Sequence, residues 1–119
     1  MHENKLTDNC LLLIRDAKSI AEDNNNQRLN SLHVLKSSIL NQHKLIETIL
    51  ENKILNKDKF LNYVNVKLDT IPKVNGEIEI HLDEDFKKLI NFAEKISNSN
   101  GDSYISTDSI IAALTLENL

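Results

Sequence analysis

The side chains that most often carry catalysis or bind metals are scattered along this sequence without a recognisable pattern. His2, His43 and His81 lack partners at metal-ligand spacing, and the single cysteine, Cys10, cannot complete a zinc site with them. We expect His33, in the first turn of a predicted helix, to be a hydrogen-bonded packing residue. No order of serine, histidine and aspartate indicates a nucleophile, and no paired carboxylates indicate acid–base catalysis. The sequence therefore predicts a domain that is not an enzyme and holds no metal.

Two kinds of loop resemble ion-binding or phosphate-binding motifs only superficially. Residues 23–26 place an aspartate before a run of asparagines, but a calcium loop also needs a glycine at its sixth position and a closing glutamate. Neither Gly76 nor Gly101 begins the GxxxxGKS/T pattern of a phosphate-binding loop. We therefore expect no nucleotide or other cofactor in this domain.

A repeat organises the chain. Residues 82–116 look like a second copy of residues 6–40 when the sequence is shifted by 76 positions. This period is longer than that of solenoid repeats, so we expect one domain built from two related halves. The matched apolar pairs are Leu6 and Leu82, Cys10 and Phe86, Leu13 and Leu89, Ile14 and Ile90, Ala17 and Ala93, Ile20 and Ile96, Leu29 and Ile105, Val34 and Ile110, Leu35 and Ile111, and Leu40 and Leu116.

The repeat singles out one surface position. Asp16 of the first copy is replaced by Phe92 in the second, so a position expected to face water in one half carries a large apolar ring in the other. On a helical wheel, Phe92 lies about 100° from the centre of the buried stripe, and Ile96 lies between the two. Phe92 and Ile96 are therefore predicted to form an apolar strip suited to weak capture of exposed hydrophobic segments. The alternative is that the linker or the other repeat covers Phe92.

Helical periodicity dominates both copies. The first copy covers about residues 5–72, a linker covers 73–81, and a partial second copy covers 82–119. Pro72 ends the last helix of the first copy, and the alternation at 77–80 is too short to predict a sheet. The predicted helices cover about residues 7–23, 31–41, 43–52, 57–70, 83–98 and 107 onward, with N-caps at Thr7, Ser31, Asp83 and Thr107.

The composition supports a single all-α domain over residues 1–119. Apolar residues make up 40% and aromatic residues 4% of the chain, which predicts an aliphatic core. Two glycines and one proline are too few for the turns of a sandwich or barrel. A net charge of −4 without a basic cluster argues against nucleic acid as a partner, and the absence of a long apolar run or leader argues against a membrane. We expect a soluble, cytoplasmic protein in which Cys10 is a buried thiol.

Four segments of the sequence stand out: Lys-Leu-Thr at 5–7, Ser-Leu-His-Val-Leu at 31–35, Ile-Pro-Lys-Val-Asn-Gly at 71–76, and Gly-Asp-Ser-Tyr-Ile-Ser-Thr-Asp at 101–108. Together they resemble the N-terminal domain of the Clp unfoldases and disaggregases, and within that family the linker is most similar to the ClpB type. The sequence departs from the family pattern at Asn30 and Ser109, and residues equivalent to about 41–70 are missing after Leu116.

The resemblance implies a duplicated Clp-repeat fold, with pseudo-twofold four-helix repeats of which the second is truncated. It also implies a place at the front of a homohexameric AAA+ machine that threads unfolded or aggregated polypeptide through its pore and works with DnaK-type partners. ATP would bind to the parent protein and not to this domain. By resemblance, the polypeptide-binding residues are Thr7, Phe92, Ile96, Asp102 and Asp108.

Three alternatives stay open at the level of sequence. Thr7, Asp102 and Asp108 also fit purely local roles as a helix cap, a turn former and a first-turn acid. The domain could instead dock a folded adaptor, as in ClpA-type and ClpC-type relatives, or be a small free-standing enzyme or regulator. If the second copy is truncated, we expect apolar surface on its two helices to be exposed or covered by another copy.

Overall fold

The computed structural model describes residues 5–118, which form six helices and one pair of short parallel strands. The fold is all-α, as predicted, and no helix within the described range is long and apolar enough to cross a membrane. In chain order the elements are α1 (Asp8–Asp23), β1 (Arg28–Leu29), α2 (Ser31–Leu40), α3 (Lys44–Asn52), α4 (Lys57–Leu68), β2 (His81–Leu82), α5 (Glu84–Ser99) and α6 (Thr107–Asn118).

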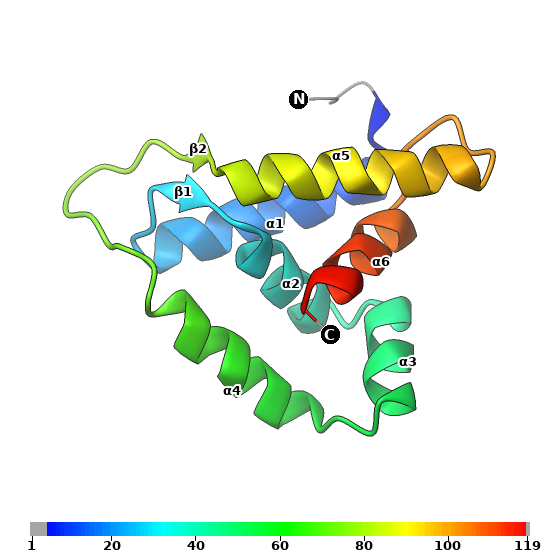
Figure 1. Ribbon diagram of the computed structural model, residues 1–119. Coiled ribbons are helices and arrows are strands. Elements are labelled where there is room, and N and C mark those ends of the chain that lie inside the picture. Colours follow the sequence, from blue (N-terminus) through cyan, green and yellow to red (C-terminus); the bar gives the residue numbers. More distant parts are fainter. Residues whose placement is uncertain (1–4, 119) are drawn as a thin grey trace.

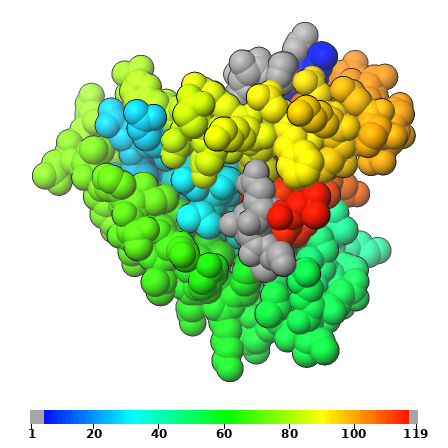
Figure 2. Space-filling view, in the orientation of Figure 1, coloured from blue at the N-terminus to red at the C-terminus, as the bar shows by residue number. Residues whose placement is uncertain are grey.

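The helices α2 and α6 form the centre of the molecule (Figure 1). α1 and α4 pack against α2, while α5 and α3 pack against α6. The space-filling view shows the last turns of α6 between α5 and α3 (Figure 2). Because α2 and α6 are covered on several sides, apolar and small residues recur around them and not along a single stripe. Their buried residues are Ser31, His33, Val34, Leu35, Ser37, Ser38 and Ile39 in α2, and Ser109, Ile110, Ile111, Ala113 and Leu114 in α6.

The core is aliphatic, and it follows the repeat. Cys10 and its counterpart Phe86 are both fully buried. The outermost matched pair behaves differently, because Leu40 is 53% exposed and Leu116 is 69% exposed. The sequence predicted exposed apolar surface on α5 and α6 if the second copy is truncated. Among the residues of these two helices whose burial the structure describes, Leu116 is an exposed large apolar residue, whereas Phe92 and Ile96 are half-buried.

Two equivalent backbone pairings join the halves. Leu29 of β1 lies opposite Leu82 of β2, and an isolated parallel bridge places Leu6 beside Ile105. Leu6 corresponds to Leu82 in the repeat, and Leu29 corresponds to Ile105, so each pairing is the counterpart of the other. The sequence did not predict these two short strands at 28–29 and 81–82, which exist because each half supplies the partner for the other.

The caps of α1 and α5 agree with the sequence. The Thr7 side chain accepts a hydrogen bond from the Cys10 N–H at 3.2 Å, and Asp83 accepts one from the Glu84 N–H at 2.8 Å. Each cap satisfies a backbone donor that the first turn of a helix leaves without a partner.

The caps predicted for α2 and α6 were wrong by one residue. Asn30, not Ser31, is the N-cap of α2, and its side chain accepts a first-turn N–H at 2.8 Å. Ser106, not Thr107, plays this part for α6, where its Oγ accepts a first-turn N–H at 3.1 Å. The Ser31 hydroxyl instead donates to the Asp85 carboxylate at 3.0 Å, so a tertiary contact uses the side chain that the sequence assigned to a local cap.

Two further boundaries differ from the sequence prediction. α3 begins at Lys44 because the His43 side chain caps it, and α4 ends at Leu68 with Asp69 as its C-cap, three residues before Pro72. The alternating residues 77–80 form no strand, which confirms the interpretation of that short alternation. The paired residues are His81 and Leu82, which lie beside β1.

Candidate functional site

A surface hollow opens where α5 ends and α6 begins. Its volume is about 280 Å³, and the N-terminal turn of α3 closes one side of it. We call it the repeat-2 hollow. It is lined by Leu45, Ile96, Asn100, Asp102, Ser106, Asp108, Ser109 and Ala112.

The loop that forms one wall is fixed by its own backbone. Gly101 adopts a φ of +80°, a left-handed conformation that side-chain-bearing residues rarely adopt. The Asp102 N–H then donates back to the Ser97 carbonyl at 2.9 Å, which closes the end of α5. Asp102 is exposed, so its carboxylate stands at the rim of the hollow and not in its floor.

The floor of the hollow is polar but satisfied. The Ser97 and Ser109 hydroxyls lie 2.7 Å apart, and the Ser106 hydroxyl lies 3.2 Å from that of Ser109. Ser109 is buried, so these hydrogen-bonded hydroxyls give the hollow a polar floor. The large apolar side chains of the lining are Leu45 and Ile96, which are both half-buried.

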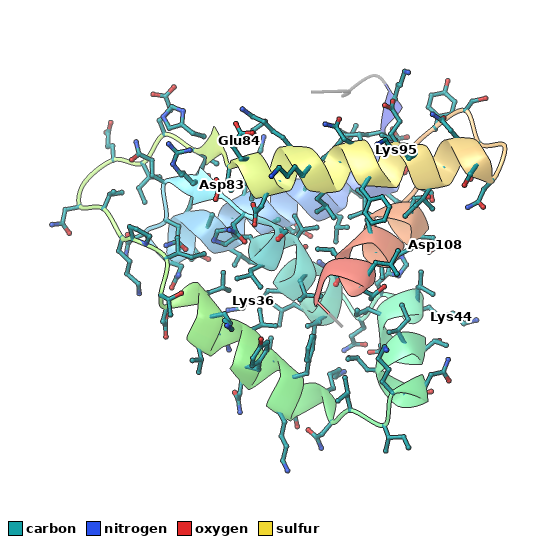
Figure 3. The ribbon with its side chains drawn as sticks, viewed as in Figure 1. Lys36, Lys44, Asp83, Glu84, Lys95 and Asp108 are labelled. Carbon is teal, nitrogen blue, oxygen red and sulfur yellow. The ribbon has the colours of Figure 1, made fainter. Side chains whose placement is uncertain are left out.

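A second exposed carboxylate, that of Asp108, also lines the hollow. Asp108 is 72% exposed in the first turn of α6, next to the start of α3 (Figure 3). Its Oδ1 lies 3.7 Å from His43 Nε2, which also lies 3.2 Å from the Thr107 hydroxyl. The other ring nitrogen of His43 accepts the Leu45 N–H at 3.2 Å. His43 therefore joins α3 to α6 and holds Leu45 at the hollow.

The predicted site residues separate into three groups. Ile96, Asp102 and Asp108 line the repeat-2 hollow together. Phe92 lies one helical turn before Ile96 on α5, half-buried against the core, whereas its neighbour Leu89 is fully buried. Thr7 does not line the hollow; it caps α1, and its N–H donates to the Ile105 carbonyl at 3.1 Å.

Asp16 and its counterpart Phe92 have different surroundings in the two halves. Asp16 accepts hydrogen bonds at 3.3 Å from the Asn41 amide and from Arg15, and it lines a second hollow of about 250 Å³. Phe92 instead packs partly against the apolar core. The second hollow, which we call the α1 hollow, is lined by Asn9, Leu12, Leu13, Arg15, Asp16, Asn41, His43 and Thr107.

Sequence reasoning missed Leu45 and His43. No spacing connects these residues to positions 102–109, because α3 meets α6 only through tertiary packing. It also missed Ser106, although the repeat held the signal: Ser106 is the counterpart of Asn30, the N-cap of α2.

The side chains of Cys10 and His33 are buried and hydrogen-bonded inside the core, as the sequence predicted. Burial raises the pKa of the Cys10 thiol, which lies 3.1 Å from the Ile105 carbonyl oxygen. Burial also lowers the pKa of His33 to about 4, and its two ring nitrogens bond the Asn30 N–H at 2.9 Å and the Asn26 side chain at 3.0 Å. Within residues 5–118, no group of three or more histidine, cysteine, aspartate or glutamate side chains is placed to hold a metal ion.

The family model and the curated relatives that match this chain indicate the same protein family. The model of the Clp repeat (R) N-terminal domain matches residues 5–118. The chain is 28% identical over 120 residues to the chaperone protein ClpB of Rickettsia conorii, with 99% of this chain covered. It is 30% identical over 118 residues to ClpB of Clostridium perfringens, with 96% covered. The chain spans about 14% of the length of these curated relatives.

Solved structures show the same fold. The Hsp104 N-terminal domain from Candida albicans matches with a TM-score of 0.76 and 28% identity, covering 92% of this chain and 73% of that one. The N-terminal domain of the ClpV1 ATPase from E. coli matches with a TM-score of 0.81 but 17% identity, covering 97% and 69%. The second likeness shows the fold alone.

Proposed function

The chain belongs to the Clp repeat (R) N-terminal domain family, and from this premise we propose that it recruits unfolded or aggregated polypeptide to a ClpB-type disaggregase. The observation that carries the proposal is the repeat-2 hollow, where half-buried apolar side chains and exposed carboxylates meet on one surface. In this proposal, ATP hydrolysis, hexamer formation and contact with DnaK-type partners belong to the parent protein, and the domain itself needs no cofactor.

The hollow would bind polypeptide through two kinds of side chain, apolar and acidic. Leu45 and Ile96 provide apolar contact, and Phe92 extends that contact by one turn along α5. Asp102 and Asp108 at the rim accept hydrogen bonds from the polypeptide backbone or from basic side chains. The apolar area is small and the ligand loses conformational freedom, so the dissociation constant should be about micromolar or weaker.

Thr7 contributes from outside the hollow. Its backbone bond to Ile105 holds the strand-like residue that leads into Ser106 and the first turn of α6. Thr7 therefore positions the loop that carries Asp102 and need not touch the polypeptide.

Amide chemical shifts test this function directly. We would titrate a permanently unfolded protein, reduced and carboxymethylated α-lactalbumin, into the labelled 119-residue chain and use the native form as control. The Gly101, Asp102 and Asp108 amides should shift with the unfolded form only. The Ile96→Ala and Phe92→Ala variants should bind several-fold more weakly, whereas Val66→Ala, which removes an exposed apolar residue from α4, should bind like the wild type.

The opposite pattern would refute the proposal. Amides at the hollow that stay in place while the unfolded protein is added would exclude this surface. Unchanged affinity in both the Ile96 and Phe92 variants, with their folds verified by the same spectra, would exclude the apolar contact.

A folded adaptor is the second candidate partner, because one specific surface favours it. Leu11 and Leu12 on α1 are 41% and 47% exposed, and Leu12 lines the α1 hollow. An adaptor of a ClpA-type unfoldase added to the labelled chain should shift the amides of α1 if this reading holds. Shifts confined to the repeat-2 hollow, or none, would contradict it.

A further inference from the structure

Within residues 5–118, repeat 1 holds a segment of its own chain at the place where repeat 2 has its hollow. The segment 71–74, which follows α4, crosses the turn at 24–26. The Val74 N–H donates to the Asn25 carbonyl at 2.9 Å, and Lys73 faces Asn26 in an antiparallel bridge. The Asn26 amide is buried, and its Nδ2 lies 3.2 Å from the Pro72 carbonyl oxygen.

The turn beside the repeat-2 hollow has the same backbone. Asn25 has a φ of 57° and its counterpart Gly101 has a φ of 80°. The Asn26 N–H donates to Ala21 at 2.8 Å, and the Asp102 N–H donates to Ser97, the counterpart of Ala21, at 2.9 Å. Within the part of the chain that the structure describes, no hydrogen bond reaches the Gly101 carbonyl. The repeat-2 hollow thus offers the backbone edge that repeat 1 already uses.

The side chains around the two turns differ in charge. The buried amide of Asn26 becomes the exposed carboxylate of Asp102, and Leu32 becomes Asp108. Lys36, which lies close enough to His33 to lower its pKa, becomes Ala112. Repeat 2 therefore keeps the shape of the turn, gains two negative charges and loses a positive one.

We propose that the repeat-2 hollow binds an extended polypeptide segment in the register that 71–74 adopts on repeat 1, and that it selects an apolar residue followed two positions later by lysine or arginine. In this register the ligand's basic residue takes the place of Lys73 and lies opposite Asp102, and the next N–H donates to the Gly101 carbonyl. Opposite charges that face each other across paired strands attract. This inference rests on the proposed function, because it specifies which segments the same hollow takes.

The chain supplies its own probe. An acetylated and amidated hexapeptide with the sequence of residues 70–75, Thr-Ile-Pro-Lys-Val-Asn, should shift the Gly101 and Asp102 amides of the 119-residue chain. The same peptide with glutamine in place of lysine should bind about twofold to fivefold more weakly at low salt, which is the range for an exposed ion pair. The difference should shrink as salt is added.

Two matched changes separate charge from backbone register. The exposed Asp102→Asn variant should bind the lysine and glutamine peptides equally. A lysine peptide whose valine nitrogen is methylated cannot donate to Gly101, and it should bind about twofold to tenfold more weakly to both proteins.

The outcomes distinguish this inference from the proposed function. If unfolded α-lactalbumin shifts the hollow but lysine and glutamine peptides bind alike, the charge selection is wrong and the function stands. If N-methylation has no effect, the register is wrong. If neither the peptides nor the unfolded protein moves the amides of the hollow, the proposed function and this inference fail together.

Discussion

The Thr7 N–H donates to the carbonyl oxygen of Ile105 across 3.1 Å, and this bond ties the start of repeat 1 to the second half of repeat 2. Its counterpart joins the Asp83 N–H to the Leu29 carbonyl at 2.9 Å. Thr7 and Asp83 are also the N-caps of α1 and α5. Each half therefore anchors the other through the residue that begins its own first helix.

Removing the Thr7 hydroxyl should weaken the fold by about 1 kcal/mol, because the Cys10 N–H loses its acceptor while the backbone bond to Ile105 remains. Urea unfolding of Thr7→Ala measures the change, and Thr7→Ser, which keeps the hydroxyl, serves as the control. Equal stability in the alanine variant would show that the cap contributes nothing.

Asn26→Asp should destabilise the chain by about 2–4 kcal/mol, because it places a carboxylate among buried carbonyl oxygens and removes the amide donor to Pro72. Hydrogen exchange at the Val74 amide should accelerate as the segment 71–74 is released. The reverse change at the equivalent exposed position, Asp102→Asn, should alter stability by no more than about 0.5 kcal/mol. A small effect at Asn26 would contradict the anchoring role.

The free energy of unfolding should fall as the pH drops from 6.5 toward 4. An unfolded histidine takes up a proton near pH 6.5, whereas burial holds the folded pKa of His33 at about 4, so the unfolded state binds more protons in this window. The slope from one such group is at most about 1.4 kcal/mol per pH unit. His33→Gln should flatten the profile between these values, while the exposed His81→Gln variant should keep it. Parallel profiles in all three proteins would refute the assignment.

Ile54→Gly should stabilise the chain by about 1 kcal/mol. Ile54 follows α3 with a φ of 55°, a conformation that is costly for a β-branched residue, and it is 93% exposed, so its side chain contributes no core packing. Ile54→Ala, which keeps a Cβ, should gain less. Thermal or urea unfolding compares the three chains, and a loss of stability in the glycine variant would show that the exposed isoleucine makes an unseen stabilising contact.

Cys10 should resist thiol reagents until the chain unfolds. Its side chain is fully buried and burial raises the pKa of the thiol, so little thiolate is available to react. A cysteine placed at the exposed loop residue in the Cys10→Ala, Ser103→Cys variant should react at once. Rapid native-state labelling of Cys10 would indicate local opening of α1.

Much of the fold follows from the repeat because core positions recur where the chain repeats its apolar spacing. Cys10 and Phe86 differ greatly in size yet both are fully buried, since their helical position decides their environment. The caps of α2 and α6 were misplaced because Ser31 and Thr107 are good capping residues whose hydroxyls have tertiary partners instead. Local propensity cannot anticipate a partner that lies far away in the sequence.

The sequence by itself determined the all-α class, the two related halves, the caps Thr7 and Asp83, and the position of Phe92 and Ile96 beside the buried stripe of their helix. These features depend on residue type and spacing within one helix or one turn. Only the tertiary structure decided that Asp102, Asp108 and Leu45 share one hollow, that Thr7 lies outside it, and that segment 71–74 fills the equivalent place in repeat 1. Those relations depend on how separate helices pack, which the spacing within any one of them does not encode.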